Sequence, residues 1–243
     1  MLHQSLTIAS LNLHWGCGSG GTPYDVTAAC GTLASDVICL QEVWSPGGEP
    51  SIARKAAAEL GYNVLELPLT ALADINGFRV VRTESEATGS WGLAVLTRFP
   101  VTASAVIDLG RAAGDTVRRA AQLVTLELPD GTSMQVANTH LTHRLLYAPG
   151  QLKRLFSQLR FFESTVVMGD LNMVGPLAGA VSRRRRPVRG RTWPAGRPVA
   201  QLDHALVSSD LSVLKAEVLP RLGSDHLPIR VALTVPPDRR GRS

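Results

Sequence analysis

The stretch of sequence that decides the fold is QLVTLELPDGTSMQVANT, residues 122–139. It contains two runs of strand-forming residues, Gln122–Leu128 and Ser133–Thr139, separated by the turn Pro129-Asp130-Gly131-Thr132. Because Gly131 tolerates the positive φ that a tight turn requires, this pattern predicts a β-hairpin. Sheet structure is therefore expected on both sides of it.

Short apolar runs on both sides of the hairpin predict further strands. They are Leu6–Leu13, Val37–Leu40, Tyr62–Leu67, Leu93–Thr97, Val166–Met168, His204–Val207, Val213–Val218 and Ile229–Val235. Apolar residues at helical spacing predict three helices: one that begins with Thr22 as N-cap and Pro23 at its first position, one over Ser51–Leu60 that ends at Gly61, and one over Gln151–Phe162. Many strands with a few helices between them indicate an α/β protein with two packed sheets and helices outside.

The 243 residues suit one compact domain, because the sequence contains no internal repeat and no stretch typical of an interdomain linker. We predict that this domain covers residues 1–235 and that the basic tail, residues 236–243, is disordered. The polar, glycine-containing segment from Thr70 to Ser90 is predicted to be a long surface loop.

Composition restricts the class of protein. Hydrophobic residues make up 44% of the chain, which is enough for a sizeable core, and the formal net charge of +5 favours an anionic partner. Cys17, Cys30 and Cys39 form neither a CxxC pair nor an even set, so we expect reduced thiols that pack in the core. No segment has the ~18 apolar residues of a membrane span, and the N-terminus lacks a signal-peptide pattern. We therefore expect a cytoplasmic, soluble monomer.

Polar residues stand where the predicted strands end, in six places. They are Asn12, Glu42, His140, Asp170 with Asn172, Asp203, and Asp225 with His226. One such residue could simply cap a turn, but six clusters of acid, amide and imidazole type indicate a functional site. If the strand ends converge, they form a carboxylate-rich pocket for a hard divalent cation. Oxygen ligands without thiols favour Mg²⁺ or Mn²⁺ over zinc.

Six short strings resemble, in order, the motifs of the endonuclease/exonuclease/phosphatase family, which is also called deoxyribonuclease I-like. They are LNLHW (11–15), LQEVW (40–44), NTHL (138–141), GDLN (169–172), LDH (202–204) and GSDHLP (223–228). Each string alone has little specificity, but the ordered set, spread over most of the chain, is highly specific. The resemblance implies a four-layer α/β sandwich, in which two mostly antiparallel sheets pack face to face with helices outside.

The resemblance also implies a hydrolase of phosphate esters with Mg²⁺ as cofactor, for which Mn²⁺ can substitute. In this family pattern Glu42 would be the main metal ligand. Asn12 and Asp225 would contribute directly or through water. A cation held in this way supplies positive charge to the phosphate group, which otherwise repels a nucleophile.

The same resemblance assigns the catalytic roles. Asp170 would orient and deprotonate the attacking water, and Asn172 would hold that water or a phosphate oxygen. His226 would face the phosphoryl group as an imidazolium, with Asp203 fixing its orientation and favouring its charge. His140 would be a second phosphate-facing donor or a proton source for the leaving oxygen.

Arginines and one tryptophan are the candidates for substrate binding. Arg118 or Arg119, at the entry to the hairpin, would support His140, and the register between the two is undecided. An arginine run follows the GDLN string and contains Arg183, Arg184, Arg185, Arg186, Arg189 and Arg191. We predict that this run forms a phosphate-binding rim on the pocket, with a solvated loop as the alternative. Trp193, directly after it, is the best placed residue to contact a base or an apolar group.

These features predict a nuclease that hydrolyses phosphodiester bonds by in-line attack of an activated water. The runner-up is a phosphatase or phosphodiesterase acting on a lipid headgroup or a small phosphorylated metabolite, although the sequence has no apolar membrane-docking hairpin. A nonenzymatic nucleic-acid-binding protein is a third alternative, and its binding would survive the loss of Glu42. The NTH string departs from the third motif of abasic-site endonucleases, which argues against abasic-site repair. DNA and RNA, endo- and exonucleolytic cleavage, diesters and monoesters, and one or two metal ions all fit the motifs.

Overall fold

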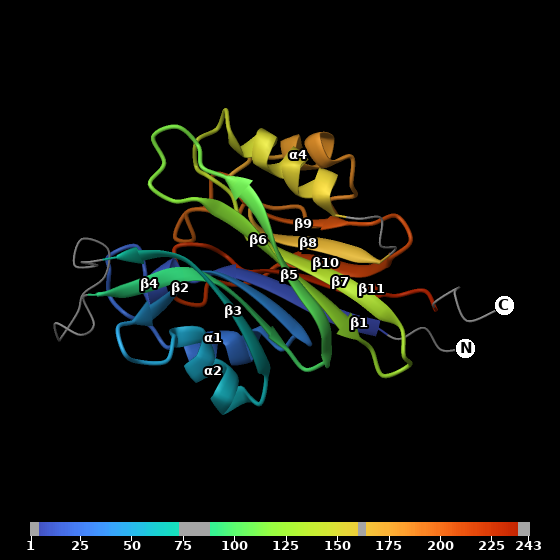
Figure 1. Ribbon diagram of the computed structural model, residues 1–243, viewed down its shortest axis with the longest axis horizontal. Helices are drawn as coiled ribbons and strands as arrows, with labels where there is room; N and C mark the ends of the chain where they lie inside the picture. The colour runs from blue at the N-terminus through green and yellow to red at the C-terminus, as the bar shows by residue number, and fades with distance from the viewer. Residues whose placement is uncertain (1–4, 73–87, 160–163, 238–243) are drawn as a thin grey trace.

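Two β-sheets lie at the centre of the protein in a computed structural model that describes residues 5–72, 88–159 and 164–237 (Figure 1). The larger sheet has six strands, in the order β10 (Ser212–Val218), β11 (Ile229–Thr234), β1 (Ser5–Asn12), β2 (Val37–Pro46), β4 (Gly89–Thr97) and β3 (Asn63–Leu72). The smaller sheet has five strands, in the order β5 (Val101–Gly110), β6 (Arg119–Glu127), β7 (Ser133–His140), β8 (Thr165–Asp170) and β9 (Asp203–Val207).

Helices cover the outer face of each sheet (Figure 1). The helices α1 (Val26–Leu33) and α2 (Ile52–Leu60) pack on the larger sheet, and α4 (Ala148–Gln158) and α5 (Leu177–Ser182) pack on the smaller one. The core between the sheets contains fully buried side chains such as Ile8, Val124 and Val231. Each sheet thus has one face for its partner sheet and one for its helices, which is the predicted four-layer sandwich.

The predicted hairpin is confirmed. Strands β6 and β7 pair antiparallel, with Leu126 opposite Met134, and Gly131 in the connecting turn has a φ of 80°. The eight strands predicted outside the hairpin are also present. Cys17, Cys30 and Cys39 are buried free thiols, as expected. Within the described residues, no helix has the length and apolar character that would let it cross a membrane.

Some local predictions are wrong. Helix α1 begins at Val26, and its N-cap is Asp25, whose carboxylate accepts a hydrogen bond of 2.8 Å from the backbone N–H of Ala28. Strand β5 was not predicted, because most of its side chains are exposed and its sequence therefore lacks an apolar pattern. Helix α4 begins at Ala148, before the predicted start. Most of the predicted loop from Thr70 to Ser90, the end of the third predicted helix and most of the tail lie outside the described residues.

Parallel strand pairs bring the predicted site residues to one edge of each sheet. Strands β1 and β2 are parallel, with Asn12 opposite Gln41, so the chain leaves both at the same edge. Strands β7 and β8 are also parallel, with His140 opposite Asp170. Strand β9 is antiparallel to β8 and begins at that edge, because Asp203 pairs with Asp170. Strand β11, antiparallel to β1, begins beside the end of β1. The strand ends therefore converge, which is the condition that a shared carboxylate-rich pocket requires.

Candidate active site

Asn12, at the end of β1, joins the polar residues of the two sheets. Its Nδ2 atom lies 3.2 Å from Oε1 of Glu42 and 3.1 Å from Oδ2 of Asp170, so the amide donates to both carboxylates. Its Oδ1 atom accepts a hydrogen bond of 2.9 Å from the backbone N–H of His14. Asn12 therefore holds the carboxylates of Glu42 and Asp170 together, and its contribution to metal binding stays a prediction.

Glu42 lies in a β-bulge that turns its side chain into the site. The register of β2 with β4 shifts between Leu40 and Val43, and Glu42 has a φ of 51°. This left-handed conformation costs a non-glycine residue ~1–3 kcal/mol, so the surrounding structure must hold it in place. Burial raises the pKa of the Glu42 carboxyl, and the nearby His14 and the amide of Asn12 oppose that rise.

The Glu42 carboxylate fits a hard divalent cation. Its Oε2 atom is buried and has no hydrogen-bond partner among the described residues, an arrangement that is costly unless a cation or a proton balances it. Asp225 is close enough to raise the pKa of Glu42 further, so two carboxylates are available. Across residues 5–72, 88–159 and 164–237, no three His, Cys, Asp or Glu side chains form a complete metal cluster. Mg²⁺ commonly binds one or two carboxylates together with water and substrate oxygens.

Asp170 ends β8 at the bottom of the site. Its Oδ1 atom accepts a hydrogen bond of 2.9 Å from the backbone N–H of Asn172, and its Oδ2 atom accepts the one from Asn12. Burial raises the pKa of Asp170 to about 7, and the carboxylates of Asp203 and Glu42 add to this rise. A carboxylate with this pKa can take a proton from water near neutral pH.

His226 is held between two aspartates. Its Nδ1 atom lies 2.8 Å from Oδ2 of Asp203, and its Nε2 atom lies 3.7 Å from Oδ2 of Asp170. Burial disfavours the imidazolium, but the negative charges of Asp203, Asp170 and Asp225 outweigh it and raise the pKa of His226 to about 10. His226 is therefore a charged donor that Asp203 holds in place.

His140 is buried and neutral. Burial holds the pKa of His140 well below its ordinary value, and the positive charges of Arg119, His226 and His143 add to this effect. Its Nε2 atom lies 3.4 Å from Oδ2 of Asp170 and 3.2 Å from Nδ2 of Asn172. His140 can exchange a proton or donate a hydrogen bond, but it does not supply a second positive charge.

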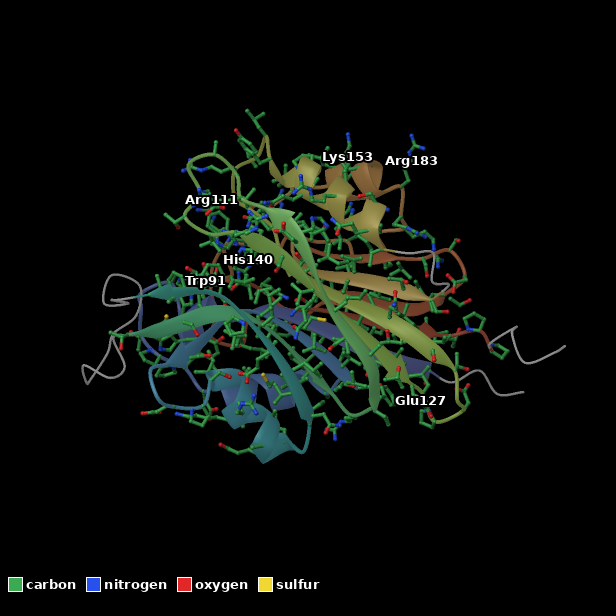
Figure 2. The ribbon with its side chains drawn as sticks, viewed as in Figure 1. Trp91, Arg111, Glu127, His140, Lys153 and Arg183 are labelled. Atoms are coloured by element: carbon green, nitrogen blue, oxygen red, sulfur yellow. The ribbon has the colours of Figure 1, made fainter. Side chains whose placement is uncertain are left out.

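The structure resolves the register of the two hairpin arginines. Arg119 is buried, and its guanidinium lies 3.5 Å from the carbonyl oxygen of His140 and over the ring of Trp91, 5.5 Å from the centroid. Arg118 is exposed and pairs with Asp108. Arg119 therefore supports His140, and Arg118 does not. Figure 2 shows His140 beside Trp91, the ring on which Arg119 lies.

The first four arginines of the run, residues 183–186, do not form the rim of this site, contrary to our prediction. Arg185 pairs with Val207, which is the end of β9 opposite Asp203, and four residues of strand span ~13 Å. The Arg185 guanidinium donates to the backbone carbonyls of Ser208, at 2.9 Å, and Leu211. The run thus begins at the far end of the smaller sheet.

Two further members of the run have structural roles. Arg186 is buried and donates to Oε1 of Gln201, while Arg184 lies over the ring of Phe156, 5.7 Å from the centroid. Arg183 is exposed and lies beside the helices, well away from His140 (Figure 2). Spacing alone could not reveal this, because it gives no information on which way each guanidinium turns.

Trp193 does lie at the site. Its indole N–H donates a hydrogen bond of 3.2 Å to Oδ2 of Asp225, and 37% of the residue is exposed. The backbone N–H of Ala195 donates to the carbonyl oxygen of Asp225 at 2.6 Å. The segment after the arginine run therefore returns to the strand edge and fixes Asp225 from both sides.

A set of buried amide hydrogen bonds joins the two sheets, and the sequence analysis did not predict it. The Nδ2 atom of Asn138, in β7, donates hydrogen bonds of 2.9 Å to the carbonyl oxygens of Leu40 and Ala94 in the larger sheet. The Nε2 atom of Gln41 donates to Oδ1 of Asn138 at 2.7 Å. The signal was present in the sequence, because both amides lie inside the apolar strands that carry the NTHL and LQEVW strings.

His14 is a second site residue that was missed. It has a φ of 46°, and Trp15 after it has a φ of 53°, so two successive residues adopt the left-handed conformation. The His14 Nδ1 atom lies 3.1 Å from the carbonyl oxygen of Cys17 and 3.8 Å from Oδ1 of Asp225. His14 thus faces the same carboxylates as the proposed cation, and its place in the LNLHW string could have pointed to it.

Comparisons with known proteins identify the family and the fold. Residues 9–226 match the Endonuclease/Exonuclease/phosphatase family. An endonuclease/exonuclease/phosphatase from Beutenbergia cavernae has a similar structure, with a TM-score of 0.74 at 21% identity, covering 96% of this chain and 72% of that one. So does the 3'-5' exonuclease NExo from Neisseria meningitidis, with a TM-score of 0.58 at 12% identity, covering 93% and 98%.

A third similar structure is the inositol polyphosphate 5-phosphatase domain of SPsynaptojanin, which was solved with inositol (1,4)-bisphosphate and calcium. Its TM-score is 0.52 at 16% identity, with coverage of 96% of this chain and 85% of that one. No curated protein sequence matches this chain. At these identities the solved structures support the four-layer fold, and the match over residues 9–226 concerns the family as a whole.

Proposed function

This chain belongs to the endonuclease/exonuclease/phosphatase family, and we propose that it hydrolyses phosphodiester bonds with a bound divalent cation. It is a phosphoesterase of that family, whose enzymes typically use divalent metals. A phosphodiester resists hydrolysis because its negative charge repels a nucleophile, so an enzyme must supply positive charge and an oriented water.

The chain of contacts from Asp203 through His226 to Asp170, at 2.8 Å and 3.7 Å, carries this proposal. Asp170 accepts the proton of the attacking water. The side-chain amide of Asn12 and the backbone N–H of Asn172 each donate a hydrogen bond to one oxygen of the Asp170 carboxylate. His226, kept as an imidazolium by its aspartates, donates to a phosphoryl oxygen. A divalent cation at Glu42 would add positive charge at the same phosphate.

Nucleic acid is the substrate class that we propose first. The indole of Trp193 is partly exposed at the mouth of the site and tied to Asp225, so a base could stack on it next to the reacting phosphate. The net charge of +5 favours a polyanion, and the exonuclease NExo has the same fold. The arginines at positions 183–186, which the sequence suggested as phosphate contacts, lie away from the site and do not support a nucleic-acid substrate.

The experiment compares three substrates: plasmid DNA, single-stranded DNA or RNA, and bis-nitrophenyl phosphate. Trp193→Ala should raise the KM for single strands by at least ~10-fold, because stacking one base contributes ~1–3 kcal/mol. Trp193→Phe retains a stacking ring and loses only the N–H bond to Asp225, so it serves as the matched variant. Cleavage of the nitrophenyl diester without cleavage of any nucleic acid would show that the natural substrate is a phosphate ester of another class.

A phosphate ester in a lipid headgroup is the second candidate. One observation favours it: the loop after His140 exposes three consecutive apolar residues, Leu145, Leu146 and Tyr147. Our sequence reasoning counted the lack of an apolar docking hairpin against a lipid substrate, whereas this loop is an apolar element of another kind. The inositol phosphatase domain of SPsynaptojanin also has this fold.

A further inference from the structure

The loop between β7 and α4 carries the most exposed apolar side chains near the site. Leu145 is 67% exposed, Leu146 93% and Tyr147 44%. Val174, in the neighbouring connection from β8 to α5, and Leu177, the first residue of α5, are also exposed. Both connections leave the sheet edge where His140 and Asp170 lie. Soluble proteins commonly expose single apolar residues, but a run of three at a loop tip marks an interaction surface.

The base of this loop is firmly anchored. The backbone N–H of Thr142 donates to Oε1 of Gln151 at 2.9 Å, and its hydroxyl donates to Asp115 at 2.7 Å. The Arg144 guanidinium donates to the carbonyl oxygen of Gly114 at 2.8 Å, which ties the loop to the connection from β5 to β6. These hydrogen bonds hold the loop on both sides of His143, so the apolar tip is exposed on an anchored segment of the chain.

The charged side chains of the loop and of α4 are basic, and Asp108 in β5, which lies near Arg154, is already paired with Arg118. Residues 141–159 include Arg144, Lys153 and Arg154 and contain no aspartate or glutamate. In the neighbouring connection, residues 111–118, Arg111 is exposed, while the only acidic residue, Asp115, is buried against Arg119 and Thr142. Figure 2 shows Arg111 and Lys153 on the same end of the molecule, above His140.

We propose that residues 143–147 dock this enzyme on an anionic lipid bilayer. Two leucines can enter the boundary between headgroups and acyl chains, and a tyrosine suits the interface because it has an apolar ring and a polar tip. Basic residues around them are attracted to anionic headgroups. The tip follows His140 in the same connection, so docking places this end of the molecule against the headgroups.

Other occupants fit these observations less well. A second copy of the chain would bring two basic loops together in a twofold contact, and their like charges would repel. Duplex nucleic acid would attract the arginines, but it offers little apolar surface for two adjacent leucines. The docking itself is independent of the proposed function, whereas hydrolysis of a headgroup ester rests on it.

The test is cosedimentation with vesicles of phosphatidylcholine alone and of equimolar phosphatidylcholine and phosphatidylglycerol. We expect binding to the anionic vesicles only. The double variant Leu145→Ser/Leu146→Ser should weaken it by at least ~10-fold, because two apolar side chains no longer leave water. Leu214→Ser, which changes an exposed leucine on β10, is the matched control and should bind like the wild type. Arg144→Glu should weaken binding to anionic vesicles by ~5-fold or more.

Two activity measurements separate the proposals. The loop variants should hydrolyse bis-nitrophenyl phosphate at the wild-type rate and should lose hydrolysis of phospholipid headgroups in vesicles. Equal vesicle binding by the wild type and the double leucine variant would overturn the docking proposal. So would a loss confined to binding of duplex DNA, which would assign the loop to nucleic acid. Vesicle binding by a protein that cleaves no diester would leave docking in place and overturn the proposed function.

Discussion

The side-chain amide of Asn138, in β7, donates a hydrogen bond of 2.9 Å to the backbone carbonyl of Leu40, in β2 of the facing sheet. Leu40 is the last paired residue before the bulge that turns Glu42 into the site. This bond therefore ties the shape of the bulge to the opposite sheet. Together with the hydrogen bond from Asn12 to the Glu42 carboxylate, it helps to hold the strained left-handed residue in its direction.

Asn138→Leu should weaken cation binding as well as stability. The variant leaves the carbonyls of Leu40 and Ala94 unpaired in the core, at a cost of ~1–3 kcal/mol each in the free energy of unfolding. A relaxed bulge should also raise the Mn²⁺ concentration needed for half-saturation by ~10-fold or more, as measured by calorimetry on the metal-free protein. Gln135→Leu, a buried amide farther along β7, is the control. Equal losses of Mn²⁺ affinity in both variants would contradict the positioning role of Asn138.

Chelation of metal should abolish activity. We expect no hydrolysis of bis-nitrophenyl phosphate in EDTA and recovery with Mg²⁺ or Mn²⁺. Glu42→Gln should raise the metal requirement strongly, because the orphaned carboxylate oxygen is the best placed ligand in the site. Glu217→Gln, which removes a surface ion pair with Arg230, should have no such effect. Full activity in EDTA would rule out the proposed cation.

Loss of either central catalytic group should slow turnover by at least ~10²-fold, which is the usual scale for a positioned acid or base. The variants are Asp170→Asn and His226→Ala, assayed by kcat with the nitrophenyl diester. Asp203→Asn should also lower kcat, because His226 loses the carboxylate 2.8 Å from its Nδ1 atom. Circular dichroism should show a retained fold. A variant with near-wild-type kcat would remove that residue from the mechanism.

His204 should make the protein less stable in mild acid. Burial lowers the pKa of His204 to about 4, and its Nε2 atom lies 2.7 Å from the carbonyl oxygen of Met173. In the unfolded chain its pKa returns to ~6.5, so between these values the unfolded state binds more protons than the folded state. Stability is therefore highest above pH ~6.5 and falls as the pH drops toward 4.

The change from about pH 7 to about pH 5 should cost ~2 kcal/mol through His204 alone. His204→Gln, which can still donate to Met173, should lose that much less over the same range. Urea unfolding at both pH values measures the difference. An identical pH dependence in the two proteins would show that His204 titrates normally in the fold.

Arg186 should matter for stability and not for chemistry. Arg186→Ala leaves Oε1 of Gln201 without its buried donor, so the free energy of unfolding should fall by ~1–3 kcal/mol. The kcat for bis-nitrophenyl phosphate should stay unchanged. Arg183→Ala, at an exposed position of the same run, should alter neither quantity. A large drop in kcat for Arg186→Ala at unchanged stability would show that Arg186 acts at the active site.

The sequence by itself determined the fold class and which residues gather at the strand ends. The hairpin at residues 122–139 and the apolar runs around it depend on local patterns. In the structure, the parallel pairs place Asn12 at one edge of the larger sheet and His140 and Asp170 at one edge of the smaller sheet. Strand β5 escaped prediction because an exposed edge strand needs no apolar alternation.

Only the tertiary structure decided the hydrogen bonds, the charges and the side-chain directions of the residues at the site. Asn12 and Asp170 are 158 residues apart in the sequence, and a hydrogen bond joins their side chains. The Asn12 amide also donates to Glu42, so it positions two carboxylates. The neutral charge of His140 follows from burial and from neighbouring cations, and the inward turn of Arg119 follows from packing against Trp91. Residue types and their spacing specify strands and edges, but pKa values and side-chain directions depend on distances between elements that are far apart in the sequence.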